Sequence, residues 1–358
     1  MKRVVWFVAV SMLASVLCTG ATAAPRYSVT YLGTLGSNRS WAQGINNNGQ
    51  VVGFSYPAAG GYHAFMWQNG SMRDLGALSG GWSGAYNINE SGQIAGWSIA
   101  SQGFTHAAYW KDGSITDVGA FGHQSGGLED VNESGQYVGR YWGGTPGFAG
   151  FIWQNGTATL LNTLGGLSTS PTAINDLGTV VGESTTASEA NRAFVWQNGA
   201  ITDLGAGDGS TASDVNNSGQ VVGTLAYTPG YLHPFLWQNG TLSDLGTLGG
   251  AGGEAYGISS SGQIVGVRYP DGGGRHAFVW QDGVVTDLND AIPAGSGWEL
   301  QIAYGINDNG QIVGYGFMGD NKVDARAFLL TPVPEPSSLL ALIAGIGGIG
   351  GLMWRRRG

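Results

Sequence analysis

A nine-residue phrase occurs seven times in this chain and limits the folds that are open to it. The phrase starts with a branched aliphatic residue and Asn or Ser, has Gly at its fifth position and ends in Gly. Its copies span residues 45–53, 88–96, 131–139, 174–182, 215–223, 258–266 and 306–314. A period of 41 to 48 residues marks an array of structural repeats. Because every repeat supplies a copy of the same residues, the array argues against a single special catalytic residue.

Each repeat contains two hairpin signatures. In the first, a strand that ends at the aliphatic residue meets a turn such as Asn48-Gly49, and in the second, a strand that ends in Trp meets a turn such as Asn69-Gly70. Asn-Gly and Asp-Gly supply the positive φ angles that type I′ turns require. Four short strands per period predict one blade of a β-propeller. We therefore expect an all-β fold, a seven-bladed β-propeller.

The repeats begin and end out of phase, which indicates how the ring closes. Residues 31–36 align with the fourth-strand phrase at 244–249, whereas residues 326–330 form a third strand with no fourth strand after it. The N-terminal strand near residues 27–32 is therefore predicted to pair with residues 327–330 and to complete the last blade. Closure of this kind removes two exposed strand edges.

Residues 1–23 are predicted to be a secretory signal peptide. Two basic residues precede an apolar run, and small residues lead to a cleavage site that we place after Ala23. The only cysteine, Cys18, lies in this leader, so the exported domain has no thiols for disulfides or metal sites. The propeller is assigned to residues 24–331, a length that can bury a core without disulfides.

The charge and composition exclude some partners. The chain carries 15 basic and 24 acidic residues, a formal net charge of −9. Nucleic-acid binding depends on clustered cations that neutralise phosphates, so we expect no nucleic-acid partner. Only 11% of the residues are charged and 65 are Gly, which favours a turn-rich β protein over a disordered chain.

Residues 332–358 form a separate C-terminal tail. Pro334, Glu335 and Pro336 are followed by an apolar run from residue 339 to residue 354 and then by a basic end. The basic residues are Arg355, Arg356 and Arg357. The apolar run predicts a hydrophobic helix that is short for a membrane span. The arginines are expected to stay on the cytoplasmic side, which leaves the repeats outside.

This tail resembles the PEP-CTERM sorting signal of Gram-negative bacteria in the order of its three parts. The resemblance implies recognition by an exosortase, transient tethering to the inner membrane through the C-terminal helix, and removal of the tail. It also implies a final location at the cell surface or in an extracellular biofilm matrix that contains exported polysaccharide. The alternative is a plain C-terminal membrane anchor, because apolar and basic tails are also generic stop-transfer devices.

The repeats resemble the extracellular HAF-repeat family, which is named for a His-Ala-Phe phrase. The phrase is intact at residues 63–65 and 276–278. It departs from the pattern at Ala108, Gly150, Arg192, Pro234 and Arg326. The resemblance covers residues 27–330 and implies an exported repeat protein, but it implies no activity.

Three kinds of side chain recur at fixed repeat positions. We expect the repeated tryptophans to pack between blades, since large aromatic rings dominate such cores; they are Trp67, Trp110, Trp153, Trp196, Trp237 and Trp280. Four residues earlier stand His63, His106, His233 and His276. Asp74, Asp117, Asp203, Asp244 and Asp287 recur at the fourth strand. Equivalent positions are spread around a ring and cannot converge on one metal, so we expect structural hydrogen bonds and turn contacts.

The sequence therefore indicates no metal and no cofactor. Residues 307–310 share some ligand types with a calcium loop, but the bidentate Glu of such a loop is missing.

Loop lengths indicate which face of the ring binds. All variation in length falls in the connections between the second and third strands and between the blades, and these two kinds emerge on the same face. Insertions confined to one face of a repeat protein usually mark its binding side. The same connections are rich in aromatic residues, and we select Trp82, Trp142, Trp298, Tyr141, Tyr227 and Tyr269 as candidate ligand-binding residues. The alternative is that these rings pack the rim of the core.

These observations predict an exported, non-enzymatic cell-surface or matrix protein. Its loop-rich face is expected to bind an exopolysaccharide or a cell-surface protein. The competing hypothesis is a glycoside hydrolase or polysaccharide lyase on the same scaffold, which needs paired carboxylates roughly 5–9.5 Å apart. The best candidates for such a pair are Glu129 with Asp130 and Glu133, or Glu183 with Glu189. Neither group is a convincing catalytic cluster.

Overall fold

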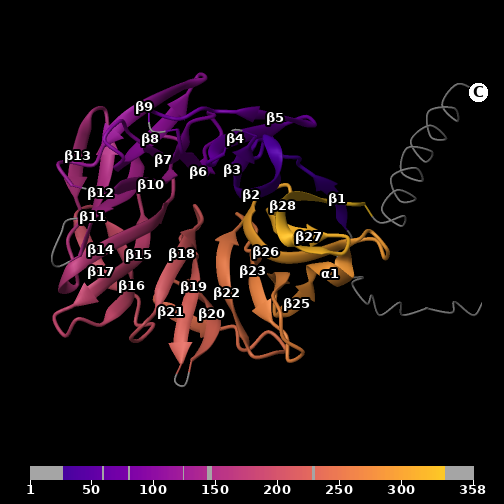
Figure 1. Cartoon of the computed structure of the whole chain (residues 1–358). Helices are drawn as coiled ribbons and strands as arrows, with labels where there is room; N and C mark the ends of the chain where they lie inside the picture. The colour runs from indigo at the N-terminus through magenta and orange to yellow at the C-terminus, as the bar shows by residue number, and fades with distance from the viewer. Residues whose placement is uncertain are drawn as a thin grey trace, which may run out of the picture.

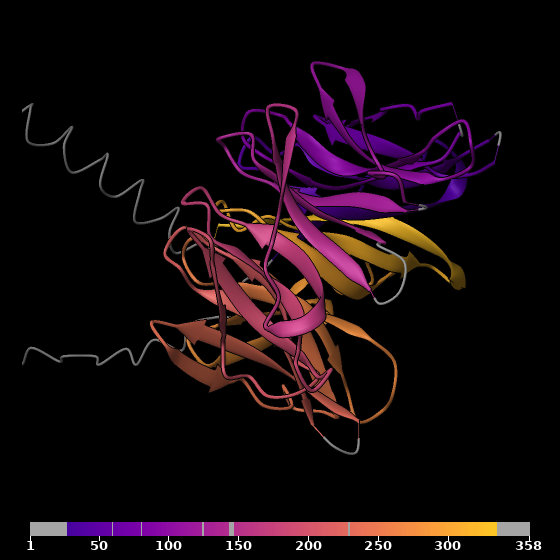
Figure 2. The same cartoon turned by 90° about the vertical axis from the view of Figure 1, so that its left-hand side faces the viewer.

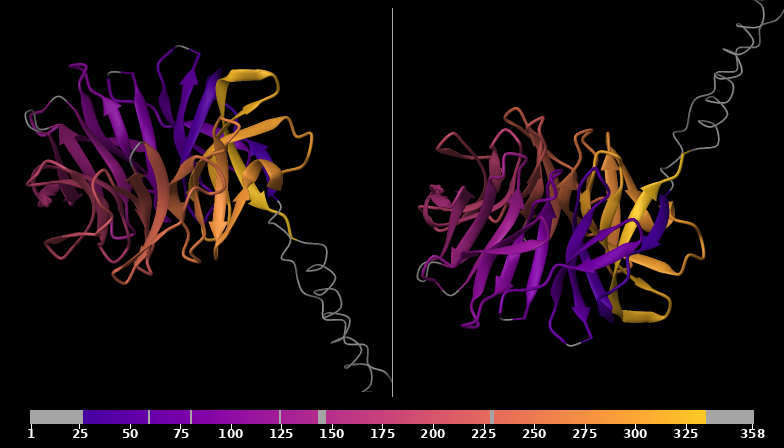
Figure 3. Two further views of the ribbon diagram at one scale, coloured as in Figure 1. Left: turned by 90° about the horizontal axis from the view of Figure 1, so that it is seen from below. Right: turned by 90° about the horizontal axis from the view of Figure 1, so that it is seen from above.

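The computed structural model is a ring of seven four-stranded antiparallel sheets, as predicted (Figures 1 and 3). It describes residues 27–334, apart from residues 59, 80, 124, 143–146 and 228–229. The predicted signal peptide and the predicted C-terminal helix lie outside the described residues. Each sheet forms one blade, and its first strand lies nearest the axis of the ring in the six blades that follow chain order.

The blades follow the chain in order, and each takes four consecutive strands except the last. Blade 1 is β2 (Gly36–Ile45), β3 (Val51–Pro57), β4 (His63–Gln68) and β5 (Ser71–Asp74). Blade 2 is β6 (Ser83–Ile88), β7 (Ile94–Ile99), β8 (Thr105–Lys111) and β9 (Ser114–Gly119). Blade 3 is β10 (Gly126–Val131), β11 (Tyr137–Trp142), β12 (Phe148–Gln154) and β13 (Thr157–Leu160). Blade 4 is β14 (Gly165–Ile174), β15 (Val180–Thr186), β16 (Asn191–Gln197) and β17 (Ala200–Asp203).

The second half of the ring continues the same pattern. Blade 5 is β18 (Thr211–Val215), β19 (Val221–Tyr227), β20 (Tyr231–Gln238) and β21 (Thr241–Asp244). Blade 6 is β22 (Gly252–Ile258), β23 (Ile264–Tyr269), β24 (His276–Gln281) and β25 (Val284–Asp287). Blade 7 is β26 (Trp298–Ile306), β27 (Ile312–Met318), β28 (Asn321–Pro332) and, from the other end of the chain, β1 (Tyr27–Tyr31).

The predicted closure of the ring is confirmed. Strand β1 pairs antiparallel with β28 in a register that sets Tyr27 opposite Pro332 and Tyr31 opposite Phe328. The backbone N–H of Leu32 extends this pairing by donating to the carbonyl of Ala327 at 3.1 Å. Blade 7, in yellow, lies between the indigo first blade and the orange sixth blade (Figure 2). The chain ends therefore complete one sheet, and no blade is left with three strands.

The alternating strands give the ring two faces. We call one of them the turn face; it carries the turns between the first and second strands and those between the third and fourth strands of each blade. We call the opposite face the loop face. The Asn-Gly turn has positive φ at both central residues, 50° at Asn69 and 82° at Gly70, as a type I′ turn requires. The prediction of type I′ for the first turn is wrong, because only Gly49 has positive φ there, at 71°. Its three-residue loop instead closes with Gly49 N–H donating to the Asn46 carbonyl at 3.0 Å.

The asparagine of the repeat phrase links a blade to the next on the turn face at six of the seven junctions, and only blade 6 has Ser259 in its place. Asn46 Nδ2 donates to the carbonyl of Asn89 at 3.0 Å, and Asn89 Nδ2 repeats this contact with Asn132 at the same distance. Asn132, Asn175, Asn216 and Asn307 continue the series. The contact from Asn307 to Asn46 crosses the junction between the last and first repeats. These buried amides therefore join the blades by side-chain hydrogen bonds as well as by packing.

A β-bulge interrupts every inner strand and explains the closing glycine of the phrase. The skipped residues are Gln43, Tyr86, Glu129, Thr172, Ser213, Tyr256 and Tyr304. The closing glycine lies opposite the bulge, where a Cβ atom would stand 2.0 Å from the Trp41 carbonyl oxygen at Gly53 and 1.9 Å from the Ile302 carbonyl oxygen at Gly314. Only Gly fits this approach, and each bulge redirects one side chain of the inner strand.

The core lies between the blades. The Phe of the His-Ala-Phe position is fully buried in six blades, at Phe65, Phe151, Phe194, Phe235, Phe278 and Phe328. The repeated tryptophans lie in or against hydrophobic clusters of buried residues. In blade 2, Ala108 replaces the Phe, and Trp110 is buried and donates its indole N–H to the Leu75 carbonyl at 3.0 Å. The phenylalanines are therefore the deepest aromatic residues of the repeat.

The longest insertion in the chain is packed onto the core. It contains the one helix of the described chain, α1 (Leu288–Ala291). Asp287 is the N-cap of this helix, and its side chain accepts a hydrogen bond from the Asn289 N–H. Leu288 and Ala291 are buried in the cluster that joins blades 6 and 7. The extra residues of this insertion therefore contribute to the hydrophobic core beside the closing blade.

Candidate functional site

The seven bulges line a channel along the axis of the ring. We call this space, of about 480 Å³, the central channel; it is bounded by the inner strands of all seven blades. The bulge residues are its most variable lining, since they include one carboxylate, Glu129, and three phenols, Tyr86, Tyr256 and Tyr304. The backbone of the ring is thus regular, whereas the side chains that line the central channel differ from blade to blade.

Two carboxylates, the buried Asp130 and the half-buried Asp214, brace this inner wall. Asp130 accepts hydrogen bonds from Asn87 Nδ2 at 2.6 Å and from the backbone N–H of Ile174, in the next blade, at 2.8 Å. Asp214 accepts in the same way from the N–H of Ile258 at 2.9 Å. Burial raises the pKa of Asp130 to about 8 and that of Asp214 to about 6, although these N–H donors oppose the shift.

The raised pKa values predict how stability depends on pH. Because both folded-state pKa values lie above the ordinary value of 3.8, the folded state binds more protons than the unfolded state between these limits. We expect the free energy of unfolding to fall as pH rises from about 5 to about 8. Urea unfolding across this range measures the effect, and Asp130→Asn with Asp214→Asn should flatten the slope. A free energy that rises with pH in the wild type, or an unchanged slope in the double variant, would contradict the assignment.

A groove on the loop face opens between blades 2 and 3 and meets the central channel. We call it the loop-face groove; it has a volume of about 290 Å³, and Tyr86 and Glu129 line both spaces. Its other principal walls are Trp97, Arg140, Trp142 and Phe148. The groove therefore combines aromatic faces with one carboxylate and one guanidinium.

The charged pair and the rings of the groove hold one another in place. Arg140 Nε lies 3.3 Å from Glu129 Oε1, and the guanidinium stands 4.9 Å above the Phe148 ring centroid. The Trp142 ring meets Phe148 edge to face at 4.9 Å. Burial raises the pKa of Glu129, and the nearby Arg140 opposes this shift. An acceptor, a donor and flat apolar faces are thus available within one groove.

Aromatic rings continue from this groove across the loop face. Trp97 lies 5.9 Å from Tyr62, whose ring also contacts Trp82 at 4.9 Å. Further contacts join Tyr62, Tyr56, Trp41, Tyr315 and Tyr304. We call this series the aromatic belt. It runs from the channel wall of blade 7 across blade 1 to the groove.

The structure places the predicted ligand-binding residues in different settings. Trp142 is 44% exposed in the loop-face groove, and Trp82 is 42% exposed in the aromatic belt. Trp298 is half-buried against Tyr31 and Phe328 of the closing blade.

The three candidate tyrosines contact groups other than these tryptophans. Tyr141 stacks on His123 at 4.6 Å. Tyr227 is exposed on blade 5 and donates to Asp244 Oδ2 at 2.9 Å, and Tyr269 donates to Glu254. The six candidates therefore do not form one site. Sequence reasoning also missed Arg140 and the tyrosines of the channel.

The repeated histidines pair with the repeated aspartates, so their predicted structural role is confirmed. His63 Nδ1 lies 2.8 Å from Asp74 Oδ2, and the same pair recurs in three other blades. In blade 4, Arg192 takes the place of the histidine and pairs with Asp203 at 3.0 Å. Asp74 also accepts from the Gly76 N–H at 2.7 Å, which is the predicted turn contact.

The candidate catalytic carboxylates do not converge. Glu129 pairs with Arg140 in the groove, whereas the oxygens of Asp130 accept backbone and amide N–H donors. Glu133 lies on the turn face and accepts from Ser91 Oγ at 2.8 Å. Glu183 accepts from Thr211 Oγ1 at 2.9 Å, and Glu189 has a positive φ of 61° in a loop. Among the residues that the structure describes, no group of three or more His, Cys, Asp or Glu could hold a metal ion.

Comparison with known families identifies the tail of the chain. Residues 332–357 match the PEP-CTERM protein-sorting motif, which confirms the predicted resemblance and marks an exported protein that is processed at the membrane. Pro334 is the last described residue, so Glu335, Pro336 and the three arginines lie outside the described part. Within that part, no helix has the length and apolar character needed to cross a membrane. The HAF resemblance stays a prediction, and no curated protein matches the chain.

Several solved structures resemble the ring distantly. TolB from Acinetobacter baumannii is 15% identical with a TM-score of 0.45, over 68% of this chain and 64% of TolB, so the chain spans less than two thirds of that protein. A mutant of AofleA from Arthrobotrys oligospora is 14% identical, with a TM-score of 0.44 over 73% of this chain and 88% of that chain. A mutant Aleuria aurantia lectin in complex with Fucalpha1-6GlcNAc is 12% identical, with a TM-score of 0.41 over 74% and 100%.

Proposed function

We propose that this exported propeller is a non-enzymatic binding protein that holds a neutral polysaccharide in the loop-face groove and along the aromatic belt. The observation that carries the proposal is Trp142, which is 44% exposed beside the Glu129–Arg140 pair. A pyranose ring presents an apolar C–H face that an indole can cover. Its hydroxyl groups can donate to a carboxylate and accept from a guanidinium.

The charge of the site favours a neutral glycan over an anionic one. The chain is acidic overall, and the one guanidinium of the groove is already paired with Glu129. An anionic chain in the groove would compete with Glu129 for Arg140, the one cation that lines this groove. The aromatic belt extends the contact beyond one sugar residue, which suits a polymer.

The sorting motif supplies the cellular setting of the proposal. Export is followed by transient attachment to the inner membrane through the C-terminal helix, cleavage by an exosortase, and residence at the cell surface or in the extracellular matrix. Binding of exopolysaccharide there would retain the protein after its tail is lost.

A binding role fits the groove better than hydrolysis. An inverting or retaining hydrolase needs a second free carboxylate within roughly 10 Å of the first. Glu129 is held by Arg140, and both oxygens of the neighbouring Asp130 are occupied by donors. Incubation with neutral polysaccharides, followed by assay of new reducing ends, tests the enzymatic alternative; products that disappear in Glu129→Gln would establish it.

The test of binding is a variant with Trp82→Ala and Trp142→Ala. Loss of two exposed stacking surfaces should weaken binding to dextran, galactan or mannan at least tenfold, measured by affinity electrophoresis, with no change in melting temperature. Tyr231→Ala is the matched control, because Tyr231 is 50% exposed on blade 5, away from groove and belt. Wild-type binding in the double variant, or an equal loss in the control, would overturn the proposal.

A further inference from the structure

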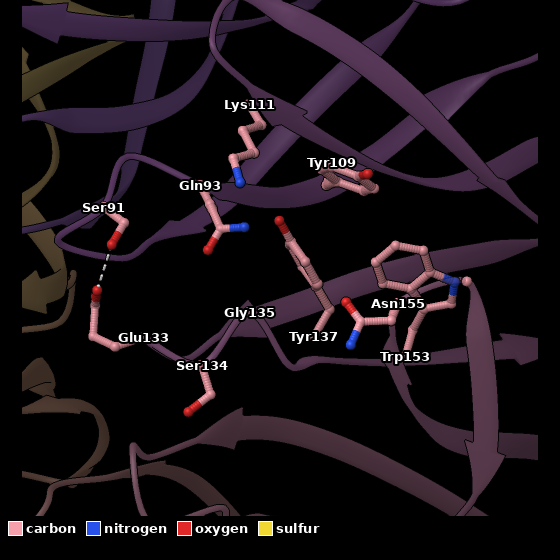
Figure 4. Close-up of a pocket in the computed structure, with 11 residues that line it drawn as sticks. Ser91, Gln93, Tyr109, Lys111, Glu133, Ser134, Gly135, Tyr137, Trp153 and Asn155 are labelled. Atoms are coloured by element: carbon pink, nitrogen blue, oxygen red, sulfur yellow. Dashed lines mark hydrogen bonds between the residues drawn. The ribbon is translucent and has the colours of Figure 1, made fainter.

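A pocket on the turn face lies between blades 2 and 3, on the opposite side of the ring from the loop-face groove. We call it the turn-face pocket; its volume of about 670 Å³ is within the usual range of small-molecule sites. The side chains of Gln93, Lys111, Tyr109 and Tyr137 converge on it, with Trp153 at one side (Figure 4). No residue of this pocket takes part in the loop-face groove.

Three lining residues break the repeat in this one place. The position of Tyr137 holds Val or Ile in the six other blades, at residues 51, 94, 180, 221, 264 and 312. The position of Lys111 holds Gln in five other blades, at residues 68, 154, 197, 238 and 281. The position of Tyr109 holds Met or an aliphatic residue elsewhere, at residues 66, 152, 195, 236, 279 and 329. Two of these changes lie on β8 and the third on β11, so they meet at one interface between blades.

The lysine leaves two hydrogen-bond donors without acceptors. In blades 3, 5 and 6, the Gln at the start of the second strand donates to the Gln of the third strand, at 3.1 to 3.5 Å. In blade 2 the second partner is Lys111, which cannot accept. Gln93 Oε1 accepts from Asn89 at 2.9 Å, but Gln93 Nε2 and Lys111 Nζ have no hydrogen-bond or ion-pair partner within the described chain.

The phenol of Tyr137 is a further unpaired group. Its residue is only 1% exposed, and its hydroxyl has no hydrogen-bond partner in the described chain. The ring itself packs well, 5.0 Å from Tyr109 and 5.6 Å from Trp153. An aliphatic residue, as in the other blades, would pack without burying an unpaired hydroxyl. The tyrosine therefore carries a free-energy cost that an oxygen-rich ligand or water would remove.

The acidic neighbour of the pocket is already engaged. Glu133 Oε2 accepts from Ser91 Oγ at 2.8 Å, and its other oxygen accepts from the backbone N–H of Glu90. The groups left free in the pocket are thus an ammonium, an amide NH₂ and a phenol, beside the flat faces of Tyr109 and Trp153. Such a set suits a ligand that offers a carboxylate, hydroxyl groups and an apolar ring face.

We propose that the turn-face pocket binds a sugar acid, a hexuronate residue of an anionic glycan. Lys111 and Gln93 hold the carboxylate, Tyr109 and Trp153 cover the ring, and Tyr137 meets a hydroxyl group. This site is independent of the neutral polysaccharide site on the loop face. The protein would then join two glycans of different charge, one on each face.

The first experiment is calorimetric titration of the exported chain with trigalacturonate and with its methyl ester. We expect the acid to bind at least tenfold more tightly than the ester, and this preference to weaken as salt rises. Lys111→Gln restores the residue of the other blades and should weaken binding of the acid at least tenfold. Lys322→Gln, an exposed loop-face lysine that pairs with Glu299, is the matched control and should have no effect.

Tyr137→Phe separates a binding role from a structural one. It removes only the unpaired hydroxyl, so the melting temperature should stay equal or rise while trigalacturonate binding weakens several-fold. Absence of trigalacturonate binding, binding that Lys111→Gln leaves unchanged, or benzoate binding as tight as that of the sugar acid would each overturn the proposal. The double variant Trp82→Ala with Trp142→Ala should leave trigalacturonate binding intact. Failure of the turn-face proposal can therefore be distinguished from failure of the loop-face proposal.

Discussion

Deletion of residues 27–31 is expected to abolish the stable ring. Strand β1 supplies the fourth strand of blade 7, and Tyr27, at 2% exposure, lies in the cluster that contains Phe328 and Leu330. Loss of a buried aromatic side chain alone costs about 3–5 kcal/mol, and the deletion also removes the β1–β28 ladder. Since domains are stable by only about 5–15 kcal/mol, we expect unfolding near room temperature, measured by circular dichroism on heating.

Point variants of β1 separate core packing from strand pairing. Tyr27→Ala should lower the free energy of unfolding by about 3–5 kcal/mol in urea, whereas Thr30→Ala, at an exposed position of the same strand, should change it by less than about 1 kcal/mol. A deletion variant that melts at the wild-type temperature would show that the ring does not depend on this closure.

The fold was predictable because its determinants are local and repeated. Asn-Gly turns fix the hairpins, and the period fixes the number of strands in a blade. The phase of the repeats, with a fourth strand at residues 31–36 and none after residue 330, then determined the closure. None of these signals depends on knowledge of contacts between distant residues.

The bulges were not predictable in the same way, although they left a trace. A bulge adds one residue to a strand without changing the repeat length, and its side chain differs from blade to blade, as with Gln43, Glu129 and Tyr256. In the sequence, a position that varies in this way cannot be told from an exposed surface position. The trace is the closing glycine of the phrase, at Gly53 and its equivalents, whose Cβ would collide with a carbonyl of the inner strand shortly before the bulge, that of Trp41 in blade 1. The interblade role of Asn46 and its equivalents likewise needed the ring geometry.

The candidate sites depended on contacts that the sequence does not encode locally. Glu129 and Arg140 meet because a bulge turns one strand of a hairpin, so neither residue identifies the other in the sequence. Aromatic content alone could not separate Trp142, which is exposed in a groove, from Trp298, which packs at the closing blade. The turn-face pocket was not predicted, because the variation in loop length indicates the opposite face. Lys111, which replaces a repeated Gln, is the sequence signal for this pocket.

Closure also determines the face from which the two ends of the described chain leave the ring. Pairing of Tyr27 with Pro332 places the start and the end of the ring side by side, and Pro332 lies against the turn of Gly310, where a Cβ atom would stand 3.3 Å from its ring. Both ends therefore leave from the turn face. A chain held by its C-terminal tail would direct the turn face toward the membrane and the loop-face groove away from it.

Substitution of the sorting motif is expected to stop release of the protein. Changing Pro334, Glu335 and Pro336 to Ala leaves the apolar run and the arginines intact, so the tail should keep the chain in the inner-membrane fraction. We expect at least a tenfold drop in extracellular protein, measured by immunoblot of separated fractions, while Ser337→Ala, just after the Pro-Glu-Pro triplet, should be released normally. Mass spectrometry of the released wild type should show a chain that lacks Trp354 and the arginines that follow it. An intact C-terminus on the extracellular protein would show that the segment is an anchor or a passive tail, because a processed chain cannot carry it.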